Sequence, residues 1–302
     1  MTHNNNFNPL PWYTSLEQQN HRKNYAYGRI YPLYTQANFM LPWQLRTTLT
    51  GEPEFILFEI YHEDGTLYQE VISSSIANNM TFIPSSGGMY VVFRPLFPIV
   101  SSQPDGRYYA KLTLTDDNSN SVTYYSEVYT VVQSLDGYLK IEWYDTDDLD
   151  YNGGKIMYKT VAYRNFIYLP TELGKPNYDF EETGEDRDGF YYPEKQLSEK
   201  TYRFSFIAPE YMLDALRLVR LSDYVTVTDQ YGYDYHADRF LMTPKWLGDG
   251  DLASVVVEFQ TDTVVKNVGT GYLRGDYADF NNDYNDDYSV VDTETENNSQ
   301  SL

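Results

Sequence analysis

The chain has 302 residues, which is long for one small β-sandwich and suits two domains of common size. It contains no Cys, so disulfide bonds, thiolate zinc sites and cysteine nucleophiles are excluded. Its 44 acidic and 22 basic residues give a formal net charge of −22, which disfavours binding to nucleic-acid phosphates. For this reason sequence-specific nucleic-acid binding is not expected either. No secretory signal and no apolar stretch of roughly 18 residues is found, so membrane insertion is not expected.

Residues 1–34 are predicted to form an extended N-terminal arm. The segment is polar and rich in Asn, yet it carries isolated large apolar side chains. Such a composition cannot form a core of its own, but its apolar side chains can dock on another subunit. Trp12 and Tyr13 are therefore candidate subunit-interface residues. Deleting residues 1–20 is expected to leave the melting temperature of the folded body nearly unchanged.

Residues 35–135 have the pattern of an immunoglobulin-like β-sandwich, with short alternating strands separated by turn signals. Residues 54–61 and 66–72 flank Asp64-Gly65, which predicts a hairpin. Residues 107–115 and 122–132 predict a second hairpin. Its first strand opens with DGRYYA, which is similar to the penultimate strand of immunoglobulin-like sandwiches, where a Tyr packs at a corner.

Residues 136–270 are predicted to form a second β domain with one helix. The boundary lies at residues 134–137, where Asp136-Gly137 breaks the strand pattern. An acidic first turn after Pro209 and apolar residues at helical spacing predict a helix that ends at Ser222-Asp223. Residues 173–200, rich in Gly, Pro and charge, are interpreted as a long exposed excursion of the kind that is often functional. Strands are expected at residues 138–144, 201–207, 224–228, 238–242 and 254–259.

Aromatic residues mark two further candidate contact surfaces, because 32 Tyr, 15 Phe and 4 Trp favour strands and interfaces over long helices. Tyr231, Tyr233 and Tyr235 recur at period two and are interpreted as one face of a strand, in the core or at a subunit interface; stacking on sugar rings stays open. Residues 271–302 are predicted to be an acidic, flexible C-terminal arm. In it, Tyr272, Tyr277 and Phe280 are candidate interface residues. Deleting residues 275–302 is also expected to leave the melting temperature nearly unchanged.

No catalytic, cofactor-binding or metal-binding residue is predicted. The four His are scattered, and nucleophile-elbow and phosphate-loop motifs are absent. The acidic loop Asp145–Asp150 offers the oxygen ligands that Ca²⁺ prefers, but it lacks the Gly and Glu that an EF-hand requires, and a solvated turn is the preferred interpretation. Arg217, Arg220 and Lys245 are expected to be solvated partners of nearby acids. A glycan-degrading enzyme with two facing carboxylates is a lesser alternative.

Five segments between residues 140 and 269 carry a resemblance to a known group of proteins: KIEWYDTDDL, YNGGKIMY, GKPNYDFEETGEDRDGFYYPEKQLSEKTYRFSF, APEYMLDALRLVRLSDYV and GDLASVVVEFQTDTVVKNVG. They resemble proteins of phages that infect Bacteroides-type gut bacteria, including crAss-like phages. The resemblance covers a little under half of the chain, and residues 192–221 are its most specific part. It implies a structural role in the virion with no catalytic residue. An all-β domain with one helix is also similar to the tail-tube and distal-tail modules of many phages.

The predicted fold is mainly β: two β-sandwich-like domains, the second with one flanking α-helix, plus extended N- and C-terminal arms. The predicted function is that of a non-enzymatic virion protein, a tail hub or tail ring subunit of a short-tailed phage. Expected partners are further copies in a ring around the tail axis and other tail or portal-proximal proteins. The expected location is the virion, assembled in the host bacterial cytoplasm, without a cofactor. The alternative is a carbohydrate-binding module or adhesin that recognises host surface glycans.

Overall fold

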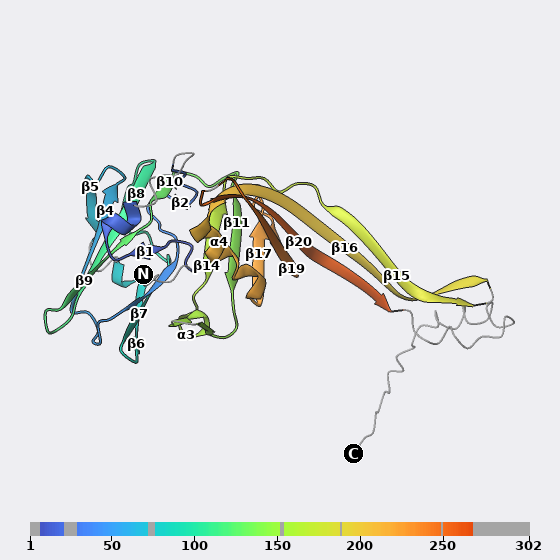
Figure 1. The fold of residues 1–302 in the computed structure, drawn as a ribbon, viewed down its shortest axis with the longest axis horizontal. Coiled ribbons are helices and arrows are strands. Elements are labelled where there is room, and N and C mark those ends of the chain that lie inside the picture. The colour runs from blue at the N-terminus through green and yellow to red at the C-terminus, as the bar shows by residue number, and fades with distance from the viewer. Residues whose placement is uncertain are drawn as a thin grey trace, which may run out of the picture. The chain divides into compact units, whose positions relative to one another are not determined.

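A computed structural model of the chain is mainly β, as predicted (Figure 1). It describes residues 7–20, 29–71, 76–151, 154–187, 189–248 and 250–267. Among these residues no helix is long and apolar enough to cross a membrane. By compactness the chain divides into two units. The larger comprises Met1–Asp179 and Glu199–Thr263, and the smaller Phe180–Ser198 and Val264–Leu302.

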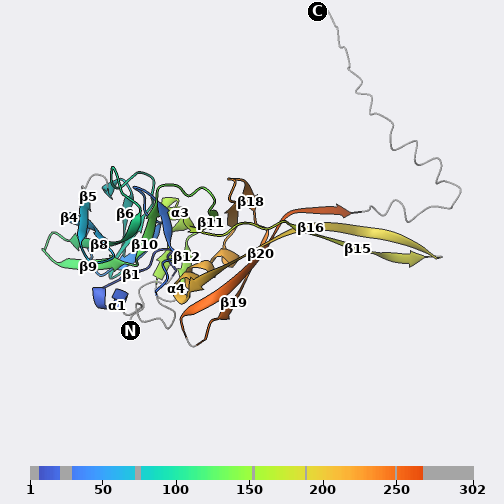
Figure 2. The same cartoon turned by 90° about the horizontal axis from the view of Figure 1, so that it is seen from above.

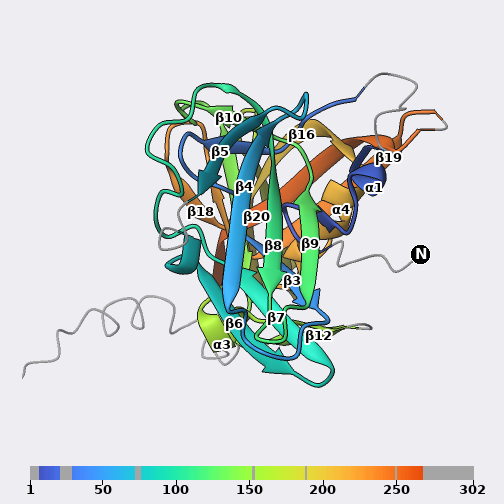
Figure 3. The ribbon, with the colours of Figure 1, turned by 90° about the vertical axis from the view of Figure 1, so that its left-hand side faces the viewer.

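The larger unit begins with two sheets (Figure 3). In the first sheet β8 lies between β4 on one side and β9 and β10 on the other. Strand β5 extends it beyond β4, while β1 and β2 pair with β9 and β10. The second sheet has the order β3-β7-β6. The strands are β1 (Trp12–Tyr13), β2 (Tyr34–Gln36), β3 (Trp43–Thr47), β4 (Phe55–His62), β5 (Leu67–Val71), β6 (Met80–Ser85), β7 (Gly88–Phe93), β8 (Gly106–Thr115), β9 (Ser121–Ser126) and β10 (Tyr129–Val132), and helix α1 spans Leu16–Asn20.

These two sheets have the strand order of an immunoglobulin-like sandwich, with β3, β7 and β6 in one sheet and β5, β4, β8 and β9/β10 in the other. The Tyr corner is present as well. The hydroxyl of Tyr108 donates a 3.0 Å hydrogen bond to the carbonyl oxygen of Pro104, and the Tyr108 side chain is fully buried. This is the first Tyr of the DGRYYA sequence, so the local pattern and the strand order agree.

An aromatic cluster fills the core of this sandwich. The rings of Trp43 on β3 and Phe93 on β7 are stacked 5.3 Å apart, and the ring of Trp12 lies 4.6 Å from Trp43 and 6.3 Å from Phe58 on β4. All four side chains are buried. Burying a side chain such as Phe stabilises a fold by ~1.5–3 kcal/mol. The cluster therefore supplies much of the packing in a chain that has no disulfide.

The predicted free N-terminal arm is wrong for residues 7–20. Leu10 and Trp12 are buried in the core, and β1 pairs with β9. The Asn8 side-chain oxygen accepts the backbone N–H of Gln44 on β3 at 2.9 Å, which fixes the segment to the second sheet as well. The pattern of isolated apolar residues arises because this segment covers an existing sandwich rather than forming a core itself.

The predicted single strand over residues 122–132 is two strands, β9 and β10, separated at Glu127. At this point the ladder is interrupted, because the Glu127 N–H bonds to the carbonyl oxygen of Pro11 at 2.8 Å. The Ser126 hydroxyl oxygen accepts the N–H of Ala110 on β8 at 2.8 Å in place of a backbone carbonyl. The Ser126 side chain thus replaces a backbone acceptor in the hydrogen-bond ladder. The alternation of apolar and polar residues alone does not predict this break.

The rest of the larger unit contains strands on both sides of the predicted helix. One sheet has the order β14-β11-β17-β18, and β12 pairs with β13. A four-stranded sheet has the order β15-β16-β20-β19, and its residues Phe180–Ser198 and those from Val264 onward belong to the smaller unit. Their buried side chains belong to one hydrophobic cluster with the first sandwich. The elements are β11 (Leu139–Tyr144), β12 (Leu149–Tyr151), β13 (Gly154–Ile156), α3 (Tyr158–Val161), β14 (Asn165–Leu169), β15 (Asn177–Arg187), β16 (Phe190–Pro209), α4 (Glu210–Leu216), η2 (Val219–Leu221), β17 (Tyr224–Thr228), β18 (Asp234–His236), β19 (Arg239–Trp246) and β20 (Leu252–Asn267).

The predicted helix is confirmed in position and is shorter than expected. It starts after Pro209, which takes an extended conformation as N-cap, and the 3-10 turn η2 completes the helical stretch before Ser222. Met212 and Leu216 are buried on the face that the spacing predicts. The strand predicted at residues 224–228 coincides with β17.

The boundary predicted at residues 135/136 separates sets of sheets, since no described sheet contains strands from both sides of it. It does not separate compact units, because both parts share one continuous core. Two hydrogen bonds also join them: the Gln44 side-chain oxygen accepts the Met157 N–H at 2.9 Å, and Arg94 donates to the carbonyl oxygen of Val161 at 2.7 Å. The second compact unit instead comprises Phe180–Ser198, within the predicted excursion, together with Val264–Leu302.

That excursion, residues 173–200, is exposed as predicted, but it is a β-hairpin rather than a loop. Strands β15 and β16 pair with each other (Figure 2). We call the described residues of Phe180–Ser198 the ribbon. The turn signal Asp188-Gly189 is present in the sequence, and Gly189 adopts a positive φ of 86° that favours glycine. The segment is so rich in charged residues that this turn signal does not stand out in the sequence.

Candidate functional site: exposed interaction surfaces

The two predicted N-terminal interface residues are engaged inside their own chain. Only 2% of the Trp12 side chain is exposed, so it is not available to another subunit in this conformation. Tyr13 is half-buried, and its hydroxyl donates a 2.9 Å hydrogen bond to the Glu127 carboxylate. The same carboxylate binds the guanidinium of Arg29, and both side chains of this ion pair are buried. Trp12 and Tyr13 therefore hold the fold together, which corrects the interface prediction.

Tyr231 and Tyr233 are exposed on the turn between β17 and β18, with exposed fractions of 77% and 67%. The interpretation as one face of a strand is wrong, because β18 contains only the third member of the stripe, Tyr235. The turn is fixed by the buried Asp229 carboxylate, which accepts the backbone N–H groups of Tyr231 and Tyr233, each at 2.9 Å. Gly232 adopts a φ of 85° within it. Two aromatic side chains are thus presented to solvent by a rigid turn.

Tyr235 points the other way. Its ring lies 4.8 Å from that of Tyr202 on β16, and its hydroxyl donates to the Asp229 carboxylate at 3.2 Å. Burial, followed by the contact with Tyr202, raises the pKa of Tyr235 above its usual value. Tyr235 therefore stabilises the turn through its hydrogen bond to Asp229. Tyr272, Tyr277 and Phe280 lie outside the described residues, and their interface role stays a prediction.

The ribbon exposes aromatic residues that sequence reasoning did not single out. Phe180, Phe190 and Tyr191 have exposed fractions of 64%, 56% and 48%, and Tyr178, just before the ribbon on β15, is 69% exposed. Paired strands that expose such side chains are unusual in a monomer, because large apolar side chains are normally buried. The sequence signal was the recurrence of Tyr and Phe through a charged segment between two strands.

The strands at the two edges of the four-stranded sheet carry opposite charge. β15 has five exposed acidic residues, whereas β19 has Arg239 and Lys245 and no acid. Of the three basic residues predicted to pair with nearby acids, Arg217 lies 3.8 Å from Asp214. Arg220 and Lys245 make no ion pair within the described part of the chain, and their pairing stays a prediction. The five acids of β15 are Asp179, Glu181, Glu182, Glu185 and Asp186.

The acidic loop at Asp145–Asp150 uses its carboxylates locally. Asp148 accepts the backbone N–H groups of Lys159 and Thr160 at 2.8 and 3.0 Å, which satisfies the first turn of α3. Asp147 lies 2.5 Å from the Lys159 ammonium. Among the described residues no group of three or more metal-ligating side chains is arranged to hold a metal ion. A capping turn accounts for this cluster of acids.

Asp145 shares a hydrogen bond with Asp223 at the start of β17. Burial, followed by this contact, raises the pKa of Asp145, whereas hydrogen bonds from Thr146 lower the pKa of Asp223. Two carboxyl groups of unequal pKa are one requirement for glycoside hydrolysis. The mechanism also requires a separation of about 5–10 Å across the bound sugar. Because Asp145 and Asp223 are joined by a direct hydrogen bond, their carboxyl groups leave no room for a sugar between them.

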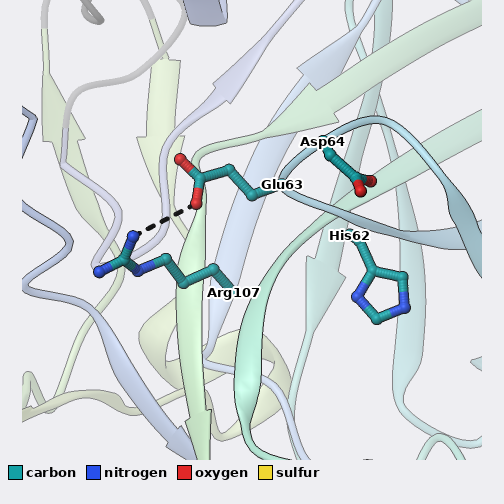
Figure 4. A pocket seen from close by; sticks show the side chains of 4 residues that line it. All are labelled: His62, Glu63, Asp64 and Arg107. Atoms are coloured by element: carbon teal, nitrogen blue, oxygen red, sulfur yellow. Dashed lines mark hydrogen bonds and ion pairs between the residues drawn. The ribbon is translucent and has the colours of Figure 1, made fainter.

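An open hollow lies beside the β4–β5 turn (Figure 4). In it, Arg107 lies 3.4 Å from the carboxylate of Glu63 and 4.1 Å from the ring centre of Tyr31. Asp64 accepts the N–H of Thr66 at 2.8 Å, and this backbone bond lowers the pKa of Asp64. The charged groups of the hollow are thus engaged within the chain. The lining residues are His62, Glu63, Asp64 and Arg107.

No protein-family model matches the chain. None of the curated proteins matches it at a significant level. The function of the chain is therefore inferred from the chemistry of its exposed surfaces.

Proposed function

We propose that this chain is a structural subunit of a phage virion, a tail hub or tail ring component that assembles by packing against further copies and other tail proteins. The observation that carries the proposal is the ribbon, which exposes Phe180, Phe190 and Tyr191 on paired strands. Ordered strands that expose aromatic side chains are suited to burial at a subunit interface. The sequence resemblance to proteins of crAss-like phages favours the virion over other assemblies.

Charge also fits an assembly subunit. The chain carries a net charge of −22, which opposes nonspecific association of free copies in solution. Contacts between copies then have to be local and complementary, because the bodies repel one another.

Virions purified from infected Bacteroides cultures provide the test. Mass spectrometry should find this chain at a stoichiometry of several copies per particle, and a phage that encodes Phe180→Ser, Phe190→Ser and Tyr191→Ser should yield particles that lack it. The matched control is Leu96→Ser with Phe97→Ser, two equally exposed apolar residues on the loop after β7. Absence of the chain from purified virions would refute the proposal.

The second candidate is glycan recognition, and the rigid turn with Tyr231 and Tyr233 favours it. Aromatic rings held in fixed positions can stack on sugar rings, and the Asp229 carboxylate removes the ordering cost of the turn. A glycan array probed with the purified chain separates the two candidates. Binding that is lost in Tyr231→Ala with Tyr233→Ala supports recognition of host glycans. A structural subunit without this role gives no signal.

A further inference from the structure

The two edge strands of the sheet β15-β16-β20-β19 are complementary in charge and are both open to another molecule. β15 carries five exposed acids and one base, Arg187. β19 carries Arg239 and Lys245, both exposed, and no acid. Strand β8 likewise carries two bases and no acid, but its Arg107 and Lys111 are paired with Glu63 and Glu59.

Further features near β19 strengthen its basic and apolar character. The 3-10 turn η2 contacts β19 and adds Arg220. None of Arg220, Arg239 and Lys245 has an ionic partner among the residues that the structure describes. Leu221 and Trp246, beside these bases in the sequence, are exposed by 65% and 49%. We call these five residues the β19 surface. It combines unpaired cations with exposed apolar side chains, which is the chemistry that an acidic, aromatic strand would match.

We propose that the β19 surface of one copy binds the β15 strand and ribbon of a second copy. The acids from Asp179 to Asp186 would meet the three cations, and the exposed rings of Phe180 and Tyr191 would cover Trp246 and Leu221. The inference rests on the proposed structural role and names the surfaces through which copies meet. Because donor and acceptor surfaces differ, the contact is heterologous, and repeated contacts of this type form a ring or an open chain.

Side-chain pairing has to contribute much of this contact. Pro244 lies within β19 and lacks a backbone N–H, so an incoming strand cannot form an uninterrupted ladder along the whole edge. Arg239 and Lys245 flank this stretch and share one face of the strand, since alternate side chains point the same way. An acidic strand alongside β19 can therefore form ion pairs on both sides of the position where the ladder fails.

Charge reversal tests the contact with the full chain. Sedimentation equilibrium at low salt should show concentration-dependent self-association that weakens at 0.5 M NaCl, because exposed ion pairs are screened. Arg239→Glu with Lys245→Glu should weaken association at least about tenfold, since like charges then face one another. Glu181→Lys with Glu185→Lys should do the same from the other side. A chain that carries all four substitutions should regain association, and so should an equimolar mixture of the two double variants.

The control is Lys155→Glu with Lys159→Glu, which changes the net charge by the same amount at exposed positions away from β19. Equal weakening in this control would mean that net charge alone acts, and the proposal would be overturned. It would also be overturned if the fourfold variant stays dissociated or if the unmodified chain is monomeric at about 100 μM in low salt. A chain found in virions yet monomeric refutes this contact while leaving the structural role standing. A chain that associates through these surfaces but is absent from virions supports this contact and refutes the structural role.

Discussion

Glu127 connects two distant segments to one point of the first sheet. It accepts hydrogen bonds from the Tyr13 hydroxyl and from the backbone N–H of Val128, each at 2.9 Å, and it binds the Arg29 guanidinium. The Arg29 and Glu127 side chains are exposed by only 6% and 3%. A buried pair adds little net stability over an apolar one, but removing one partner leaves an uncompensated charge.

We therefore expect Glu127→Gln to lower the free energy of unfolding by about 3–5 kcal/mol. The amide keeps the shape of the side chain and removes the charge that balances Arg29. Urea unfolding measures the change. Glu63→Gln is the control, because its partner Arg107 is 53% exposed and surface pairs contribute about 0–1 kcal/mol. Equal losses in the two variants would contradict the assigned role of Glu127.

Asp145 and Asp223 predict an unusual response to pH. The pKa of Asp145 is raised in the folded state, so its contribution to stability is present at low pH and is lost as the pH rises through that value. The pKa of Asp223 is lowered, so its contribution is present at higher pH and is lost on acidification. Above the raised pKa of Asp145 both groups are charged and repel one another.

Asp145→Asn should accordingly raise the melting temperature at pH 7, because the amide can donate to Asp223 as the protonated carboxyl does. The gain should shrink as the pH is lowered into the range where Asp145 of the parent chain binds its proton. Thermal unfolding between pH 3.5 and 7.5 measures it. Asp147→Asn should show no such gain, since Asp147 pairs with Lys159. A gain independent of pH would refute the shared-proton account.

At the scale of elements, the ribbon depends on a close approach between its two strands. A Cβ added at Gly184 on β15 would overlap the carbonyl oxygen of Tyr192 and lie 2.8 Å from the Cα of Pro193, both on β16. These are backbone atoms that cannot move without breaking the pairing. Gly184 is therefore required by the neighbouring strand and not by its own φ.

Gly184→Ala should unpair the ribbon and leave the larger unit folded. Hydrogen-exchange mass spectrometry should show lost protection in β15 and the outer part of β16, with unchanged protection in β8. Gly65→Ala is the control, because nothing lies within 4 Å of the added atom in the β4–β5 turn, although its φ of 91° strains a side chain locally. Ribbon amides that stay protected in Gly184→Ala would show that the strands tolerate the methyl group.

Local patterns predicted most single elements, and tertiary context decided the rest. β17 and the start of α4 follow from alternation and helix-start signals at residues 224–228 and 209–210. The break at Glu127 depends on Pro11 and Arg29, which are about 100 residues away, so no local pattern could reveal it. Period-two spacing predicts a strand at Tyr231 and Tyr233, but Gly232 between them adopts a φ of 85° and the segment forms a turn.

At the scale of the whole molecule, residues 7–20 belong to the body of the fold. Composition suggested a free arm, since isolated apolar residues in a polar segment cannot form a core alone. The partner core is supplied by β3, β4 and β9, which are distant in the sequence. The covering segment also pairs with the edge of a sheet, which otherwise invites aggregation. The role of residues 7–20 therefore becomes apparent only in the folded chain, where β3, β4 and β9 lie together.

Two truncations should therefore differ. Deleting residues 1–20 removes Leu10 and Trp12, and loss of one large core side chain already costs about 3–5 kcal/mol. The truncated chain should lose most of its cooperative unfolding or expose edges that aggregate. Deleting residues 275–302 removes eight acids from a segment beyond β20 and should leave the melting temperature nearly unchanged. Calorimetry on both chains, with deletion of residues 1–6 as the control, measures the contrast. If residues 1–20 can be removed without a change in melting temperature, their packing contributes nothing to stability, and they are an arm after all.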